Sequence, residues 1–128
     1  MRPCILTVDD SKALRLLVEK LLTDFDCEPA EAANGFNAFF AIERTRPALI
    51  LLDVSMPVMD GLEMLRRLKE APELAAIPVL MMTSPADHAV MAEIRALGVS
   101  DTIMKPFKPV DLLAKILALL PLNPRVRV

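Results

Sequence analysis

The chain has 128 residues, a length typical of a single domain. Its formal net charge of −2 offers no basic surface for nucleic acid, and its longest apolar runs are far shorter than the ~20 residues that span a membrane. The start of the chain lacks the layout of a secretory signal, so we expect a cytoplasmic location. Neither Cys4 nor Cys27 has metal-ligand spacing, and both are interpreted as small buried apolar residues.

The first third of the chain predicts a strand, a helix and a second strand. Residues 4–8 are a short apolar run that ends in Asp9 and Asp10. A helix follows, capped by Ser11 or Asp10, and Leu16 is expected to be exposed because it lies off the core-facing stripe. The residues of that stripe are Leu14, Leu17, Val18, Leu21 and Leu22. Residues 28–33 predict a strand at a sheet edge, because Pro29 cannot donate a hydrogen bond to a ladder.

A second helix, a central strand and a third helix follow. The second helix is expected to end before Pro47 and to face the core with an aromatic stripe of Phe36, Phe39 and Phe40. Leu49–Leu52 is a continuous apolar run, as in a strand buried on both faces of a parallel sheet, and it leads directly into Asp53. After a loop, Asp60 and Glu63 resemble the capped start of a third helix.

The second half of the chain continues the alternation. Residues 78–82 predict a buried strand that ends before Thr83, and a helix from about residue 86 to 97 is expected to stop at Gly98. Residues 101–104 predict a fifth strand, which ends before Lys105, and Pro109 suits the first turn of a last helix. We expect one domain over residues 1–121 and a short disordered tail over residues 122–128.

Five strands that alternate with five helices predict an α/β fold with a doubly wound, five-stranded parallel sheet. Right-handed crossovers leave few strand orders, and we expect the order 2-1-3-4-5, which places the first and third strands side by side. Ligands bind outside the carboxyl ends of the strands in such sheets. The polar residues that this order brings to that edge are Asp9, Asp10, Asp53, Thr83 and Lys105.

The three carboxylates of this set repel one another, and each close pair costs roughly 4 kcal/mol at an effective dielectric near 20. A compensating cation is therefore expected, and hard oxygen ligands with room for water favour Mg²⁺. Lys105 supplies another positive charge. A carboxylate beside both cations can attack phosphorus, so we predict Asp53 as a phosphoryl acceptor, with Thr83 donating a hydrogen bond to one phosphoryl oxygen.

From Cys4 to about Leu120 the sequence resembles the receiver domains of two-component response regulators, which have a flavodoxin-like fold, and most of all the stand-alone kind related to the chemotaxis regulator. The resemblance rests on the acidic pair after the first strand, the segment Leu-Leu-Asp-Val-Ser-Met-Pro-Val-Met-Asp-Gly, the later threonine, and Lys-Pro-Phe. It implies that Asp9 and Asp10 belong to the Mg²⁺ site, that Asp53 is the phosphoacceptor, and that Thr83 and Lys105 are the switch hydroxyl and the family's lysine.

The resemblance also implies how the chain works. Members of the family take a phosphoryl group from a phosphohistidine of a histidine kinase or phosphotransfer protein, and they slowly hydrolyse their own aspartyl phosphate. They are signalling phosphoacceptors, and this slow hydrolysis is their only further reaction. By the same resemblance Ser55 lends its backbone carbonyl to the metal, and the bond between Lys105 and Pro106 is cis.

The family's usual output is a contact with a target protein, and we expect the same here because the sequence shows no further domain. The expected surface is formed by the fourth helix, the fifth strand and the fifth helix, through which, by the same resemblance, a phosphorylation-dependent dimer can form. Candidate contact residues are Val90, Met91, Ile94, Arg95, Thr102, Asp111 and Lys115. His88, the only histidine of the chain, is interpreted as an ordinary surface residue.

Two features depart from the pattern of the family. Thr102 stands where members often have an aromatic residue that turns inward together with the switch threonine, and a threonine cannot fill an aromatic-sized space. Ser55 and Pro85, two residues after Asp53 and Thr83, flank the path of the hydrolytic water and cannot position it as a longer charged or amide side chain does. We therefore expect slow self-dephosphorylation.

Other functions of similar architecture fit the sequence less well. A haloacid dehalogenase-type enzyme needs its nucleophile after the first strand, a flavin carrier needs a phosphate loop where Asp9 and Asp10 stand, and a nucleoside triphosphatase needs a Gly-x-x-x-x-Gly-Lys loop. The remaining alternative is a receiver-fold interaction module that binds partners without phosphorylation. Thr102 favours this alternative, and the complete acidic set argues against it.

Overall fold

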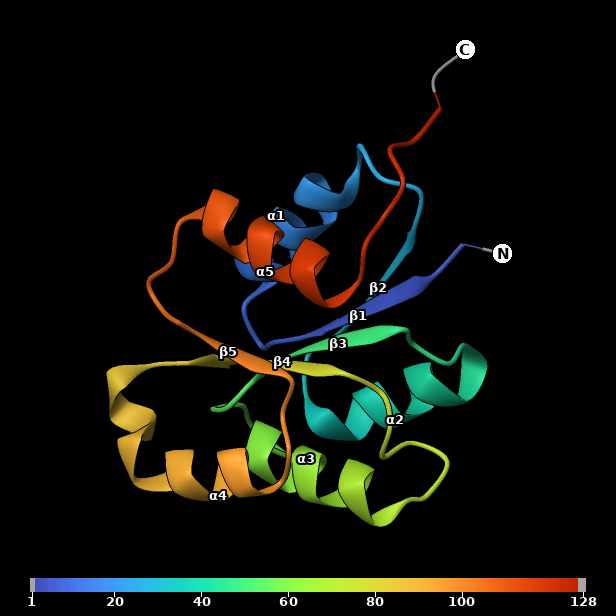
Figure 1. Ribbon diagram of the computed structural model, residues 1–128. Helices are drawn as coiled ribbons and strands as arrows, with labels where there is room; N and C mark the ends of the chain where they lie inside the picture. The colour runs from blue at the N-terminus through green and yellow to red at the C-terminus, as the bar shows by residue number, and fades with distance from the viewer. Residues whose placement is uncertain (1, 127–128) are drawn as a thin grey trace.

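The computed structural model describes residues 2–126 of the chain. Its centre is a five-stranded sheet in which every neighbouring pair is parallel, in the order β2-β1-β3-β4-β5 (Figure 1). The predicted topology, with its edge strand at residues 28–32, is confirmed. The strands are β1 (Cys4–Val8), β2 (Glu28–Ala32), β3 (Leu49–Asp53), β4 (Val79–Thr83) and β5 (Asp101–Met104).

Helices cover both faces of this sheet. In Figure 1, α1 and α5 lie on one face, and α2, α3 and α4 lie on the other. The helices are α1 (Lys12–Leu22), α2 (Gly35–Arg44), α3 (Gly61–Glu70), the 3₁₀ helix η1 (Pro85–Val90), α4 (Met91–Ala96) and α5 (Pro109–Leu119). The fourth predicted helix is therefore two segments. No helix within residues 2–126 is long and apolar enough to cross a membrane.

The three central strands are fully buried, as their continuous apolar runs predict. Alternate residues of β3 serve two different cores: Ile50 and Leu52 pack on the side of α2 and α3, whereas Leu49 and Leu51 pack on the side of α1 and α5. A one-residue change of register would exchange these two sets, so the core fixes the register of β3. That register places Asp53 at the end of the strand.

Local signals in the sequence account for where several helices begin and end. The Ser11 hydroxyl accepts a hydrogen bond from the Leu14 amide at 3.3 Å, and the Asp60 carboxylate accepts one from the Glu63 amide at 2.9 Å. Gly98, which follows α4, has φ +86°, a conformation that glycine adopts without strain. These caps and this stop are confirmed, as are the exposure of Leu16 and the burial of the two free cysteines.

The aromatic stripe of α2 is a correction. Phe36 and Phe40 are 52% and 53% exposed, and their rings meet edge to face with centroids 5.3 Å apart. The buried side of α2 is formed instead by Gly35, Ala38 and Ile42, with Phe39 only partly buried beside them. Gly35 lies against Met59, where a Cβ atom would come within 3.0 Å of its atoms, and Phe36 and Phe40, one turn apart, face outward.

The predicted disordered tail is a second correction. The Asp26 amide donates to the carbonyl of Asn123 at 2.8 Å, and the Arg125 amide donates to the carbonyl of Asp24 at 2.8 Å. These main-chain bonds and a bridge between Phe25 and Pro124 hold residues 122–125 against the loop between α1 and β2. The last part of the predicted tail, residues 127–128, lies outside the described residues.

Helix α3 begins directly against the main chain of Asp53. The Gly61 amide donates to the Val54 carbonyl at 2.8 Å. A Cβ atom on Gly61 would lie 2.0 Å from the carbonyl oxygen of Asp53 and 2.9 Å from the Cα atom of Val54. These atoms belong to the backbone and cannot turn away, so position 61 admits only glycine.

Gly61→Ala is therefore expected to destabilise the chain by roughly 1–3 kcal/mol, because α3 must move away from β3. Urea unfolding, followed by far-ultraviolet circular dichroism, measures this loss. Gly98→Asn is the matched control, since a Cβ there meets nothing within 4 Å and asparagine tolerates positive φ, so its loss is below about 1 kcal/mol. Equal losses in the two variants would contradict this account of Gly61.

Candidate functional site

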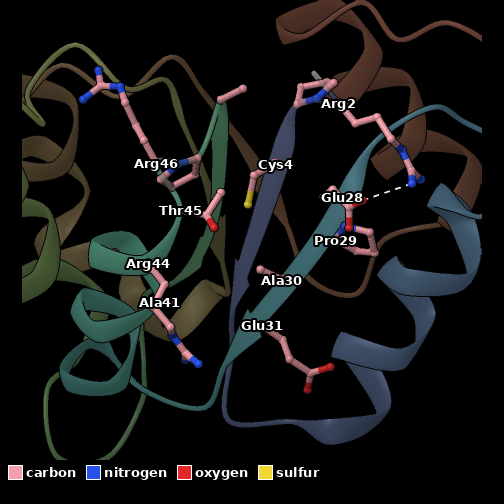
Figure 2. A pocket seen from close by; sticks show the side chains of 13 residues that line it. Arg2, Cys4, Glu28, Pro29, Ala30, Glu31, Ala41, Arg44, Thr45 and Arg46 are labelled. Atoms are coloured by element: carbon pink, nitrogen blue, oxygen red, sulfur yellow. Dashed lines mark hydrogen bonds and ion pairs between the residues drawn. The ribbon is translucent and has the colours of Figure 1, made fainter.

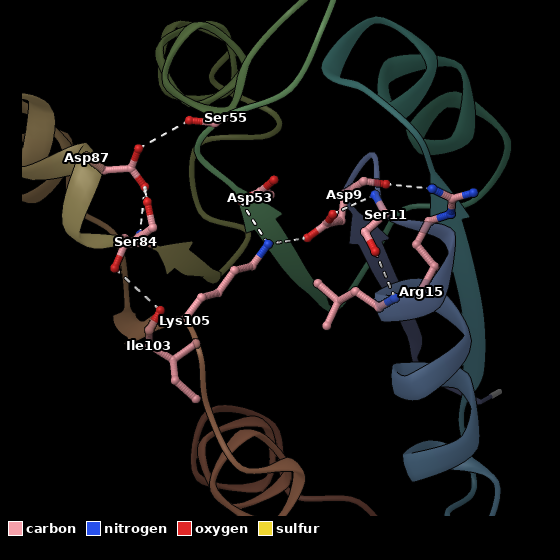
Figure 3. A network of polar contacts seen from close by, with 11 residues as sticks. Asp9, Ser11, Arg15, Asp53, Ser55, Ser84, Asp87, Ile103 and Lys105 are labelled. Atoms are coloured by element: carbon pink, nitrogen blue, oxygen red, sulfur yellow. Dashed lines mark hydrogen bonds and ion pairs between the residues drawn. The ribbon is translucent and has the colours of Figure 1, made fainter.

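Four strands end at one edge of the sheet and deliver polar side chains there (Figure 3). Asp9 follows β1 directly, Asp53 is the last residue of β3 and Thr83 the last of β4, and Lys105 follows β5. The parallel register pairs Asp53 with Met82 and Thr83 with Met104, so the ends of these strands are level. The convergence expected from the strand order is found.

The acidic residues of this edge form one cluster. Asp9 and Asp53 are 0% and 6% exposed, whereas Asp10 is open to solvent. One carboxylate oxygen of each of the three residues lies within 4.8 Å of the other two. Buried carboxylates at this spacing need a compensating positive charge.

Lys105 supplies that charge. Its Nζ atom lies 2.8 Å from Oδ2 of Asp9 and 3.2 Å from Oδ1 of Asp53, so one ammonium group bridges the two buried carboxylates (Figure 3). The side chain reaches this position from β5, across β4, and the peptide bond that follows it, Lys105–Pro106, is cis as the resemblance implied.

The pKa values of Asp53 and Lys105 reflect this arrangement of charges. Burial, followed by repulsion from Asp9, raises the pKa of Asp53 from an ordinary 3.8 to about 6, although Lys105 acts in the opposite direction. Burial lowers the pKa of Lys105, but its hydrogen bonds and charge interactions with Asp9 and Asp53 outweigh burial and raise it overall. One ammonium therefore leaves the cluster with an excess of negative charge.

Asp9 is held by more than Lys105. Its Oδ1 atom accepts a hydrogen bond from the Ser11 amide at 2.8 Å, and its main-chain carbonyl accepts one from Nη1 of Arg15 at 2.7 Å. Arg15 is itself paired with Glu31 at 2.7 Å. No sequence pattern identified Arg15, because its ion pair with Glu31 joins helix α1 to strand β2, which only the fold brings together. Asp9 is thus a fixed member of the cluster.

Thr83 and Ser55 lie beside the acidic cluster, and both hydroxyls have other partners. Thr83 is buried, and its Oγ1 atom donates to the carbonyl of Ile103 at 3.5 Å, the outer limit of a hydrogen bond. The exposed Ser55 donates to Oδ1 of Asp87 at 3.2 Å. The Thr83 hydroxyl is thus bonded to β5, and the Ser55 hydroxyl is bonded to η1.

Asp87 is a buried polar residue that our sequence analysis missed. Its Oδ2 atom accepts from the Ser84 amide at 2.7 Å, the side-chain half of a capping box at the start of η1. The spacing of Ser84 and Asp87 before an apolar segment is a recognisable signal for that cap. The bond from Ser55 has no such signal, because the two residues are 32 positions apart.

A hollow of about 590 Å³ lies between η1, α4 and β5. Thr102 is among its lining residues, where the family often has an aromatic side chain, and so are Thr83, Met91, Arg95 and Met104. Of the candidate contact residues, Ile94 is wrong because it is fully buried in the core. Arg95 and Asp111 are exposed, and Lys115 is paired with Asp101 at 3.1 Å.

A second hollow of about 880 Å³ lies at the opposite end of the sheet (Figure 2). Arg2 on its rim is paired with Glu28 at 3.0 Å, and Arg46 donates to the carbonyl of Glu73. The guanidinium groups of Arg44 and Arg46 point in different directions in Figure 2. This hollow is larger than the one beside Thr102, but it contains no converging set of reactive groups.

Comparisons with known proteins agree with this geometry. The DNA-binding response regulator MtrA of Mycobacterium tuberculosis strain H37Rv is 34% identical over 123 residues, which cover 96% of this chain and 53% of that protein. The chain thus spans about half the length of this curated relative. Sporulation initiation phosphotransferase F of Bacillus subtilis is 36% identical over 107 residues, covering 84% of this chain and 85% of that protein.

Solved structures show the same likeness. The chemotaxis protein CheY4 of Vibrio cholerae superimposes with a TM-score of 0.84 at 32% identity, covering 94% of this chain and 100% of that one. Residues 5–117 match the family of the response regulator receiver domain. With the fold, the cluster at the carboxyl ends of the strands and these relatives in agreement, the chain belongs to the response regulator receiver domain family.

Proposed function

We propose that this receiver domain acts as a stand-alone response regulator whose Asp53 accepts a phosphoryl group from a phosphohistidine of a histidine kinase or histidine phosphotransfer protein. The observation that carries the proposal is the Lys105 ammonium, which lies between the buried carboxylates of Asp9 and Asp53. The stand-alone type is supported by the similarity of this chain to the whole of CheY4 and to most of sporulation initiation phosphotransferase F.

The transfer follows from the groups at this edge of the sheet. A carboxylate oxygen of Asp53 attacks phosphorus, and a P–O bond forms while the P–N bond to the donor imidazole breaks. The electron pair of that bond stays on the imidazole nitrogen, which takes up a proton from solvent. Lys105 stabilises the charge on the phosphoryl oxygens, and the Thr83 hydroxyl donates to one of them after leaving its long bond to Ile103.

The donor set also fits Mg²⁺. Asp9, Asp10, Asp53 and the backbone carbonyl of Ser55 would hold the ion, and the carboxylates alone place three oxygens within 4.8 Å of one another. Burial is the largest cause of the raised pKa of Asp53, and the second is repulsion from Asp9, a charge that a bound cation would offset. When bound, the ion neutralises charge on the transferring phosphoryl group.

Output is proposed to be a changed affinity for a target protein at the surface of α4, β5 and α5, where a phosphorylation-dependent dimer would also form. The hollow beside Thr102 and the exposed apolar side chains of Met104 and Val110 support this surface. Thr102 also favours the second candidate function, an interaction module that binds partners without phosphorylation, because it is too small to act as an inward-turning aromatic.

Intact-protein mass spectrometry after incubation with acetyl phosphate tests the proposed acceptor. We expect wild type to gain one phosphoryl group in the presence of Mg²⁺ and none after chelation, and Asp53→Asn to gain none in either condition. A wild-type chain that stays unmodified would favour the interaction module.

Self-dephosphorylation is expected to take minutes or longer, because Ser55 is bonded to Asp87 and Pro85 has no polar side chain to position water. The same mass measurement, repeated over time after removal of acetyl phosphate, gives the half-life of the phosphoryl group. A half-life of seconds would contradict the slow reaction.

The pH dependence of stability tests the charge of the cluster. The pKa of Asp53 is about 6 in the folded chain against 3.8 ordinarily, so the folded chain binds the proton more tightly and stability is lost as pH rises from about 4 to about 6. At pH 7, without divalent cations, Asp53→Asn is expected to be more stable than wild type by on the order of 1–3 kcal/mol. Urea unfolding from pH 4 to 8 measures this difference, with the exposed carboxylate variant Asp111→Asn as a control that keeps the wild-type slope.

Magnesium binding gives a further test, because Mg²⁺ and the Lys105 ammonium would share Asp9 and Asp53. At pH 7, Mg²⁺ at ten times its Kd is expected to stabilise wild type by about 1.4 kcal/mol and to raise its thermal midpoint. Asp10→Ala is expected to lose this increase, and Lys105→Met, which removes the competing charge, is expected to bind Mg²⁺ more tightly. Weaker binding by Lys105→Met would show that the lysine and the ion do not compete.

A further inference from the structure

Three polar residues connect the loop after β3 with the start of η1 (Figure 3). Asp87 accepts a hydrogen bond on Oδ1 from the hydroxyl of Ser55 at 3.2 Å. On Oδ2 it accepts from the amide and the hydroxyl of Ser84, at 2.7 and 3.2 Å. We call this set, Ser55, Ser84 and Asp87, the loop bridge.

The loop bridge depends on a carboxylate that is 7% exposed. No cation forms an ion pair with Asp87 among residues 2–126, so hydrogen bonds alone compensate its burial. Leaving a buried carboxylate without one of its donors is costly, and both oxygens here have donors. The position of Asp87 is therefore determined by both loops at once.

The two loops carry the groups on which the proposed function depends. Ser55 is two residues after Asp53, and Ser84 is the residue next to Thr83. Ser84 is tied to Asp87 a third time, because the Asp87 amide donates to the Ser84 carbonyl at 3.0 Å. A displacement of Thr83 toward a phosphoryl group on Asp53 thus reaches Ser84, then Asp87, and then the first turn of η1.

From η1 the path leads to the surface of α4. Ser84, His88, Met91 and Arg95 line the same hollow, so the loop bridge connects the acidic cluster with that surface. Thr102 is small, and its amide donates to Oδ1 of its neighbour Asp101 at 2.7 Å. The loop bridge instead joins the side chains of the two loops.

We propose that Asp87 is a positioning residue, and that the loop bridge transmits the phosphorylation state of Asp53 to η1 and α4 in place of an aromatic residue at position 102. This inference rests on the proposed function. It assigns Ser55 a side-chain role besides the backbone carbonyl, and it makes the Ser55–Asp87 bond the point where the loop of the acceptor meets the loop of the output surface.

Hydrogen exchange followed by mass spectrometry tests this role, with phosphoryl occupancy measured by intact mass on the same samples. In wild type, acetyl phosphate with Mg²⁺ is expected to change exchange in residues 85–96. At equal occupancy, Ser55→Ala is expected to reduce this change at least twofold, because it removes one bond of the loop bridge from an exposed residue. Ser55→Thr keeps the hydroxyl and is expected to restore the change.

Ser84→Ala is the matched control. It removes one hydroxyl bond to Asp87 but keeps the amide bond and the link to Ser55, so it is expected to retain most of the wild-type change. A Ser55→Ala chain that is phosphorylated and responds like wild type would overturn the inference, even if its exchange without phosphodonor is faster. A wild-type chain that gains no phosphoryl group would overturn the proposed function itself, and the role of the loop bridge with it.

Discussion

The bridge from the Lys105 ammonium to Asp9 and Asp53 is the interaction on which the rest of the site depends. Two carboxylates buried at the ends of adjacent strands would repel each other strongly, and the ammonium at 2.8 and 3.2 Å makes their burial possible. It does not neutralise the cluster fully, because Asp10 adds a third carboxylate. This partly balanced acidic cluster is the donor set that we propose for Mg²⁺.

The two sides of this site are constrained to different degrees. On the side of β3, Gly61 lies against the carbonyl of Asp53, and the Val54 amide donates to the carbonyl of Met82 at 3.2 Å, so backbone contacts fix the acidic residue. On the side of β4, the Thr83 hydroxyl makes one long bond, and the following helix starts as a 3₁₀ segment. The carboxylate of Asp53 is thus held more firmly than the Thr83 hydroxyl, which suits the proposed reaction, in which that hydroxyl moves to a phosphoryl oxygen.

Much of this arrangement was predictable because it follows from strand ends. Continuous apolar runs identify buried strands, and crossover handedness leaves few orders for them. In the order 2-1-3-4-5 the polar residues that end or follow the runs lie at the common edge, as Asp9, Asp53 and Lys105 do. Periodicity was a poorer guide for α2. Phe36 and Phe40 have the spacing of a core stripe, but so do the residues that form the buried side of α2. The tail was missed because main-chain bonds hold it, and these leave no side-chain pattern.

The contacts of Asp87 divide into one that is predictable from the sequence and one that only the structure shows. Its cap on Ser84 is local and readable, whereas its bond to Ser55 joins loops that only the fold brings together. The proposed role of Asp87 uses that bond to link the two loops in a chain whose Thr102 is too small to act as an inward-turning aromatic. Asp87 is bonded three times to Ser84 and once to Ser55, so in the proposed path it follows Ser84 when Thr83 moves toward Asp53, and its single bond to Ser55 adjusts to that movement.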